Sequence, residues 1–482
     1  MMEGRAAEAG FEYGDKPKEE CGVFGIYAPG ENVAALAYNA LFALQHRGQD
    51  AAAVVVASPE GRIEGTRGLG KVEEALGHGD FLKGLPVSDM ACGHVRYGTN
   101  ETKTKEARLA AIQPMLGGNS HSKFALSHNG HLVNFEELRQ EHPRPEQCHT
   151  DSQLMTHLIG EEVELGAGLY DAMTSVSRRL NGAYSLVVMG GGRLYGMRDP
   201  NGFRPLMLGS LNARGWAIAS EVAALDIVGA TFEREVEAGE VVEVSDDGLR
   251  SFRPFEASEI SSNLCAFEII YLSRPDNVVA GELVARARRQ AGIELARLFP
   301  VDADLVTDAP DSGTLAADGY AHKSGLPKLP ALVKNKYVGR SFIAAGQANR
   351  EEMVAAKFNA VPEIVEGQSV VVVDDSIIRG TTTKGLVNML RKAGARQVHL
   401  RIASSPYQWP CFYGMDTANR GQLIAAEMSV AGICEELGAD SLEYIPLKDL
   451  EATFGKAAGK VCMACMTGEY PTDVPRELLY SS

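Results

Sequence analysis

Residues 370–384 have the sequence VVVVDDSIIRGTTTK, and this stretch decides the fold class of the second half of the chain. Four β-branched apolar residues in a row predict a buried strand, which ends in two acids. The small and hydroxyl residues after Arg379 predict a turn that opens a helix. Strands and helices alternate around this stretch, which indicates an α/β parallel sheet. We expect strands over 303–307, 370–373 and 399–403, and helices over 282–298 and 382–393.

The two acids and the turn suit a phosphorylated sugar. Ligands of α/β sheets bind at the carboxyl ends of strands, and helix N-termini offer unpaired N–H groups to phosphate. Residues 379–383 therefore predict a cradle for a monophosphate. Asp374 and Asp375 can hold ribose hydroxyls, directly or through Mg²⁺, which prefers oxygen ligands. The stretch lacks the Gly-x-x-x-x-Gly-Lys-Ser/Thr pattern of a Walker A loop. The alternative interpretation is that this stretch binds no ligand and is only a strand end whose carboxylates face solvent.

This stretch closely resembles the motif with which type I phosphoribosyltransferases bind phosphoribosyl diphosphate (PRPP). Residues 308–314 resemble the pyrophosphate loop of that family, and residues 334–340 resemble its mobile loop. The resemblance implies one Mg²⁺ per subunit, held by Ser312, Asp374 and Asp375. It also implies a PRPP site made of Asp374, Asp375, Ser376, Arg379, Gly380, Thr381, Thr382, Thr383, Asp311, Ser312, Gly313, Lys334, Lys336, Tyr337 and Arg340.

Cys21 is the most informative residue of the first half. It follows an acidic leader that ends in Glu19-Glu20. If the chain is cut before Cys21, one residue carries both a thiol and a free α-amine. An unperturbed α-amine titrates near pH ~8, close to the ~8.5 of a thiol, so the amine can act as the base that activates the thiol. Taken alone, such a cysteine is more often a small buried hydrophobe.

Four segments after Cys21 resemble class II glutamine amidotransferases, whose nucleophile is an N-terminal cysteine. They are LQHRGQD at 44–50, HVRYGT at 94–99, HNG at 128–130 and TDS at 150–152. The resemblance implies that Cys21 is the nucleophile and that residues 1–20 are a leader removed during maturation.

The same resemblance assigns roles to five further residues. The Asn129 side chain and the Gly130 N–H would form an oxyanion hole. Arg96 would bind the α-carboxylate of glutamine with its planar donor fork, Asp151 would bind the α-ammonium, and Gly48 belongs to the same site. Singly, Arg96 or Asp151 is more often a surface ion-pair member, and Asn129-Gly130 without Cys21 upstream is more often a hairpin turn.

The first half mixes strands and helices, which indicates an α+β layered domain. We expect strands over 51–57 and 183–189 and helices over 33–44 and 152–164. The resemblances imply an N-terminal-nucleophile glutamine amidotransferase domain over 21–260. They imply an α/β type I phosphoribosyltransferase domain over 261–482, whose C-terminal tail packs back onto the core.

Composition limits the other possibilities. A chain of 482 residues is too long for one ordinary domain. A net charge of -16 argues against a nucleic-acid partner. No apolar run reaches the ~18–20 residues of a membrane helix, and residues 1–20 lack the basic start and apolar stretch of a secretory signal. We expect a cytoplasmic protein without structural disulfides.

Four of the eight cysteines form a possible metal-ligand set: Cys265, Cys411, Cys462 and Cys465. A lone C-x-x-C pair such as 462–465 can indicate zinc, redox chemistry or nothing. Four thiolates suit tetrahedral zinc as well as a 4Fe–4S cluster, so the ligand types leave both metals open. The contexts of the four resemble the amidotransferases that carry one 4Fe–4S cluster per subunit, and this favours iron–sulfur.

Together, the two resemblances imply an enzyme that hydrolyses glutamine and transfers the ammonia to PRPP, the first committed step of purine synthesis. They imply purine nucleotides as feedback inhibitors and a homo-oligomer, a tetramer or a dimer. Another class II amidotransferase, such as glucosamine-6-phosphate synthase, is one alternative, but residues 374–384 argue against it. A PRPP-binding regulator that binds DNA is a second, which the net charge and the intact Cys21 set disfavour.

Overall fold

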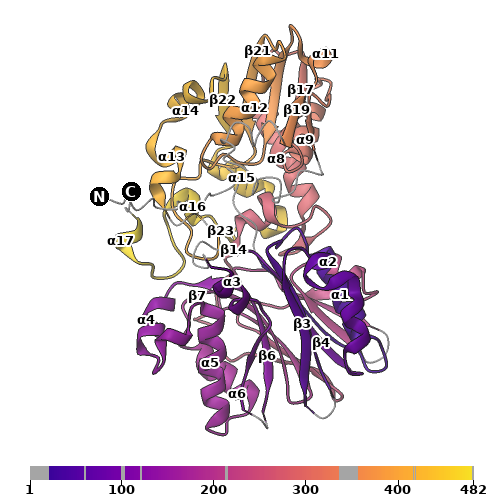
Figure 1. The fold of residues 1–482 in the computed structure, drawn as a ribbon. Coiled ribbons are helices and arrows are strands. Elements are labelled where there is room, and N and C mark those ends of the chain that lie inside the picture. Colours follow the sequence, from indigo (N-terminus) through magenta and orange to yellow (C-terminus); the bar gives the residue numbers. More distant parts are fainter. Residues whose placement is uncertain are drawn as a thin grey trace, which may run out of the picture.

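The computed structural model describes residues 21–479 except 59–60, 99–103, 120–121, 212–214, 336–356, 416 and 418. The expected leader and the expected PRPP ligands Lys336, Tyr337 and Arg340 lie outside the described residues. Figure 1 shows an antiparallel body built from the first half of the chain and an α/β body built from the second half, with C-terminal segments between them.

Two antiparallel sheets make up the first body. Their strands are β1 (Gly22–Tyr27), β2 (Ala51–Ala57), β3 (Ile63–Leu69), β4 (Met90–Arg96), β5 (Met115–Gly117), β6 (Phe124–Leu132), β7 (Gly182–Gly190), β8 (Arg193–Arg198), β9 (Met207–Leu211), β10 (Gly215–Ala219), β11 (Thr231–Glu235), β12 (Val241–Ser245) and β13 (Gly248–Phe252). One sheet has the order β11-β9-β10-β1-β4-β2-β3 and the other β13-β12-β8-β7-β6-β5. Apolar side chains from both, such as Val23 and Val187, form the core between them.

Helices cover the outer faces of these sheets. Helix α1 (Val33–Ala43) begins after the Asn32 cap, whose Oδ1 accepts a hydrogen bond from the Ala35 N–H, and its apolar stripe packs against β4 and β1. Helices α5 (Asp151–Glu164) and α6 (Leu169–Ser177) pack on the sheet that contains β6 and β7. The predicted layered α+β arrangement and its four predicted elements are confirmed.

The second body contains a four-stranded parallel sheet, β17-β20-β21-β22. The strands are β17 (Leu305–Asp308), β20 (Ser369–Asp374), β21 (Gln397–Ile402) and β22 (Ser441–Tyr444), and the main helices are α8 (Val284–Leu298), α9 (Thr314–Ser324), α12 (Thr381–Lys392) and α14 (Val430–Leu437). The predicted parallel sheet is therefore confirmed. Asp308 pairs with Val373, so the segments that follow β17 and β20 leave the sheet at the same edge.

The C-terminal tail returns to the junction between the two bodies. Strand β23 (Val461–Cys462) pairs in parallel with β14 (Leu264–Cys265), and a π-helical turn, η3 (Glu268–Leu272), follows β14. The short helices α15 (Leu447–Thr453) and α16 (Ala464–Thr467) flank β23. Within the described ranges, every helix is too short or too polar to span a membrane.

Candidate functional site

The expected glutamine ligands gather around Cys21, which lies directly before β1. Its neighbour Gly22 pairs with Val95 of β4, so the buried Arg96 at the end of β4 lies close by. Burial lowers the pKa of Arg96, while the nearby charges of Cys21, Asp50 and Asp151 oppose that shift. The structure therefore brings the predicted nucleophile and both predicted glutamine-binding charges together.

Gly48 lies against the backbone of this strand end. A Cβ on Gly48 would stand 2.6 Å from the carbonyl carbon of Arg96, so no larger residue fits without a backbone shift. Asp50, to which sequence reasoning gave no role, accepts a hydrogen bond from the Gly98 N–H at 2.6 Å. The 44–50 segment therefore fixes the backbone on both sides of Arg96.

Asn129 is buried within β6, with 1% of its surface exposed. Neither its Oδ1 nor its Nδ2 has a hydrogen-bond partner within the described ranges. A buried amide without partners costs free energy, so this one is available to a ligand. Gly130 has φ +146°, and a Cβ there would stand 2.1 Å from the carbonyl oxygen of Ala183. Because both residues lie inside a strand, the alternative of a hairpin turn is wrong.

Asp151 is the first residue of α5, after the Thr150 cap. Its carboxylate accepts hydrogen bonds from the N–H groups of Ser152 (2.7 Å) and Leu132 (3.2 Å). Burial alone would raise the pKa of Asp151, but His128, whose Nδ1 is 3.7 Å away, lowers it well below its usual range. An ionised carboxylate can bind an ammonium group. Sequence reasoning gave no role to His128, although it directly precedes Asn129.

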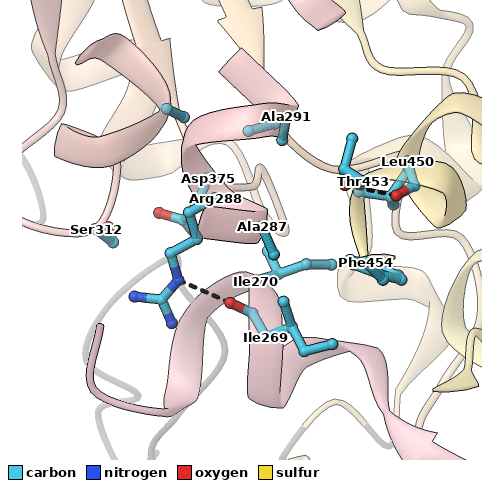
Figure 2. Close-up of a pocket in the computed structure, with 12 residues that line it drawn as sticks. Ile269, Ile270, Ala287, Arg288, Ala291, Ser312, Asp375, Leu450, Thr453 and Phe454 are labelled. Carbon is cyan, nitrogen blue, oxygen red and sulfur yellow. Dashed lines mark hydrogen bonds between the residues drawn. The ribbon is translucent and has the colours of Figure 1, made fainter. Parts of the chain in front are cut away.

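Of the expected PRPP ligands, those in the two loops that follow β17 and β20 meet at the carboxyl edge of the parallel sheet. Asp374 ends β20, and its Oδ1 accepts a hydrogen bond from the Asp375 N–H at 2.8 Å. The Ser376 hydroxyl donates to Asp375 Oδ2 at 2.7 Å. Figure 2 shows Asp375 and Ser312 in the lining of one cavity, together with Arg288. The structure therefore joins the two predicted loops in one place.

The turn before α12 has the backbone form that the sequence predicted. Gly380 caps this helix with φ +84°, and Thr381, Thr382 and Thr383 form its first turn. This position favours glycine, because a residue with a Cβ is strained at positive φ. The helix begins at Thr381, after the turn that follows the two acids, and its N-terminus offers N–H groups that suit a phosphate.

Two expected PRPP-binding cations have protein partners in this structure. Lys334, in β18 (Leu332–Lys334), donates to Asp311 Oδ2 at 2.8 Å. Arg379 donates to Gln422 Oε1 at 2.8 Å. Both cations are therefore held near the two loops by neutral or acidic neighbours.

The four expected metal-ligating cysteines line one cavity. Cys265 and Cys462 are register partners in the β14–β23 pair, and Cys411 and Cys465 complete the set beside Phe203, Phe267 and Tyr470. Burial and the neighbouring cysteines raise the pKa of Cys462 to about 12. In the described part of the chain, no group of three or more His, Cys, Asp or Glu side chains is arranged to hold a metal ion.

Comparisons with known proteins agree with this arrangement. The family model of a glutamine amidotransferase domain matches residues 104–227. Amidophosphoribosyltransferase of Synechococcus elongatus is 43% identical, covering 98% of this chain and 95% of the relative, and that of Synechocystis sp. is 42% identical, covering 96% and 93%. The solved glutamine PRPP amidotransferase of B. subtilis, complexed with ADP and GMP, is 39% identical with a TM-score of 0.86, covering 95% of this chain and 98% of that chain.

The fold and these comparisons define a glutamine amidotransferase domain followed by a phosphoribosyltransferase domain with a parallel sheet. The chain belongs to the amidophosphoribosyltransferase family. It is a glutamine-dependent pentosyltransferase of purine biosynthesis, which converts glutamine, PRPP and water into 5-phosphoribosylamine, glutamate and pyrophosphate. Both alternatives, a different amidotransferase and a DNA-binding regulator, are therefore excluded.

Proposed function

We propose that Cys21, with its α-amine freed by removal of residues 1–20, is the nucleophile that attacks the glutamine carboxamide. The α-amine takes the proton of the thiol and gives it to the departing ammonia. Asn129 Nδ2 and the Gly130 N–H donate to the developing oxyanion, while Arg96 and Asp151 hold the α-carboxylate and α-ammonium against Gly48. Water then hydrolyses the thioester to glutamate. The observation that carries this assignment is the buried Asn129 amide, which has no hydrogen-bond partner among the residues that the structure describes.

We further propose that PRPP binds between the 308–313 and 374–383 segments. Asp374 and Asp375 hold the ribose hydroxyls, the turn at 379–383 holds the 5-phosphate, and Lys334, with Lys336, Tyr337 and Arg340, contacts the diphosphate. Ammonia attacks C1 of the ribose, and pyrophosphate leaves with the electron pair of the broken C–O bond. Asp374, Asp375 and Ser312 provide oxygen ligands that fit Mg²⁺. When bound, Mg²⁺ neutralises charge on the leaving group.

The cysteine cavity fits a 4Fe–4S cluster held by Cys265, Cys411, Cys462 and Cys465. Burial raises the pKa values of the Cys462 and Cys465 thiols, which become thiolates only beside compensating positive charge. A 4Fe–4S cluster takes four thiolate ligands, and four cysteines surround this one cavity. When bound, the cluster joins β14 to the C-terminal tail.

The division into a leader (1–20), a glutaminase domain (21–260) and a phosphoribosyltransferase domain (261–482) is part of this proposal. It is supported by β13, the last strand of the two large antiparallel sheets, which ends at Phe252, and by β14, which begins at Leu264. We also propose purine-nucleotide inhibition, for which the ADP and GMP complex of the B. subtilis relative gives support. A homo-oligomer and a cytoplasmic location complete the proposal.

A covalent label tests the nucleophile and the processing together. The purified enzyme is treated with a glutamine analogue that carries an electrophilic ketone, and the modified peptide is identified by mass spectrometry. We expect one adduct, on a peptide whose first residue is Cys21. An adduct on Cys148 or Cys92, or an active enzyme that still carries residues 1–20, would contradict the proposal.

A further inference from the structure

Strand β6 lacks a neighbouring strand on one side at the residues proposed to form the oxyanion hole. On its other side, it pairs with β7 along all of its residues. On this side, β5 pairs with it only as far as Leu126, opposite Met115. Pro114, which directly precedes Met115, has no N–H group to continue the ladder. The buried backbone groups of β6 beyond Leu126 therefore need other partners at this edge.

Two buried side chains bind both backbone groups of His128 at this edge. The His128 N–H donates to Gln113 Oε1 at 2.6 Å, and the His128 carbonyl oxygen accepts from His94 Nε2 at 3.2 Å. His94 is 0% exposed and Gln113 is 6% exposed. The carbonyl that His94 binds belongs to the peptide unit that joins His128 to Asn129. The two side chains therefore fix the backbone from which the Asn129 amide extends.

His94 reaches this carbonyl from the opposite sheet. It lies in β4, where it pairs with Val23 of β1 and with Ala53 of β2. Burial lowers the pKa of His94 to about 3, so its ring is neutral, and the single N–H is on Nε2 because a carbonyl oxygen only accepts. Its Nδ1 has no hydrogen-bond partner among the described residues. Burying such an atom costs free energy, so stability alone does not account for a histidine here.

The Asn129 side chain points into the same space as His94. Alternate residues of a strand share one face, and Ser127 Oγ lies 3.3 Å from Cys92 Sγ of β4. Asn129 follows Ser127 by two residues, and His94 follows Cys92 by two residues, so both face the space between the sheets. Strand β1, which begins directly after Cys21, is the neighbour of β4. The backbone that His94 holds is therefore next to the proposed nucleophile.

We propose that His94 and Gln113 are positioning residues for glutamine hydrolysis, which hold the peptide unit before Asn129 so that its side-chain amide meets the developing oxyanion. This inference rests on the proposed function and deepens it. Neither side chain takes part in the proposed binding of the glutamine α-carboxylate and α-ammonium. A misdirected Asn129 amide loses binding of the tetrahedral intermediate rather than of glutamine. Loss of the His94 bond should therefore lower kcat and leave KM little changed.

The test compares His94→Leu, which removes the donor, with His94→Gln, whose side-chain amide can donate in place of Nε2. We expect His94→Leu to lower kcat for glutamine hydrolysis by at least about ten-fold, part of the roughly 10²–10³-fold effect of one oxyanion donor. His94→Gln should recover most of this loss. Affinity for an analogue with an aldehyde in place of the carboxamide should fall in step with kcat, because its thiol adduct resembles the intermediate, whereas affinity for glutamate should not. His399→Leu, a buried histidine of β21, is the matched control and should keep glutamine hydrolysis.

A double variant separates this inference from the proposed function. Adding His94→Leu to Asn129→Ala should cause little further loss of kcat, because His94 acts through Asn129. Multiplying losses, an unchanged kcat in His94→Leu, or a KM that rises as much as kcat falls would overturn the inference. If His94→Leu also loses ammonia-dependent synthesis and so does not fold, the kcat of Gln113→Met decides, since this variant removes the acceptor of the His128 N–H. A normal kcat in Asn129→Ala would instead overturn the proposed oxyanion hole.

Discussion

Gly313 packs directly on the end of β20: a Cβ on this glycine would stand 2.4 Å from the carbonyl oxygen of Val373 and 3.2 Å from the α-carbon of Asp374. This contact sets the distance between the two loops that we propose to hold PRPP. A methyl group here would push the 308–313 segment away from the acids.

Gly313→Ala should therefore reduce synthesis from glutamine and from ammonia alike by at least about ten-fold, since misplaced binding groups lose transition-state stabilisation. Glutamine hydrolysis without PRPP should persist. Gly432→Ala in α14 is the matched control, because its Cβ would meet only ordinary contacts at 3.5 Å or more. Steady-state assays of both variants check this, and normal PRPP kinetics in Gly313→Ala would contradict the loop assignment.

Asn129→Ala should lower kcat for glutamine hydrolysis by about 10²–10³-fold, the usual loss for one oxyanion donor. Ammonia-dependent synthesis should remain, because the PRPP loops are untouched. His128→Asn is an informative companion: it removes the imidazole that lowers the Asp151 pKa, so it should raise KM for glutamine more than it lowers kcat. Equal losses of kcat in Asn129→Ala and His128→Asn would contradict the separate roles of Asn129 in oxyanion binding and of His128 in glutamine binding.

The buried Glu268 carboxylate predicts a pH-dependent stability. Its pKa in the folded protein lies below the unfolded value of about 4.3. The stabilisation is therefore complete above about pH 4.3 and is lost as the pH falls toward 2. Glu268→Gln should lower stability at pH 7 by about 3 kcal/mol, the scale for breaking a buried pair, here the pair of Glu268 with Arg47. The difference in urea midpoint from the unmodified protein should shrink below pH ~4, because Glu268 of the unfolded chain takes up a proton there. A difference that stays constant down to pH ~3 would contradict this assignment.

A cluster on the four cysteines predicts a brown protein with broad absorption near ~400 nm and about four irons per chain. Because metal binding is coupled to folding, Cys465→Ser should give unstable protein with increased protease sensitivity. Air exposure should have the same effect. Cys434→Ser should be nearly silent, because this thiol donates a hydrogen bond to the Ala439 carbonyl oxygen, away from the four cysteines. A colourless, air-stable enzyme with one zinc per chain would replace the cluster and leave the catalytic assignment intact.

The sequence predicted the elements whose pattern is local. The apolar run at 370–373 and the alternation around it were sufficient for the parallel sheet, and the strands at 51–57 and 183–189 were found for the same reason. The two-sheet packing was not predicted in detail, because the pairing of β1 with both β4 and β10 depends on partners far apart in the chain.

The prediction of site residues from the sequence was limited in the same way. Motif order predicted Cys21, Arg96 and Asp374 as site residues, but the buried neighbours of these residues carry no sequence signal. Glu268 lies in an apolar stretch after Cys265, and only the fold shows that it faces Arg47. Likewise, spacing alone could not join Cys411 to the other three cysteines, because they meet only when β23 returns to β14.

The central claim, that two separate sites in one chain share the reaction, is tested most directly by crossed variants and two nitrogen sources. Synthesis of 5-phosphoribosylamine is measured with glutamine and with ammonia for Cys21→Ala and for Asp374→Asn/Asp375→Asn. We predict that Cys21→Ala loses glutamine-dependent synthesis and keeps ammonia-dependent synthesis, whereas the double Asn variant loses both and still hydrolyses glutamine. Equal loss of both activities in a folded Cys21→Ala enzyme, or near-normal synthesis in the double Asn variant, would contradict the account.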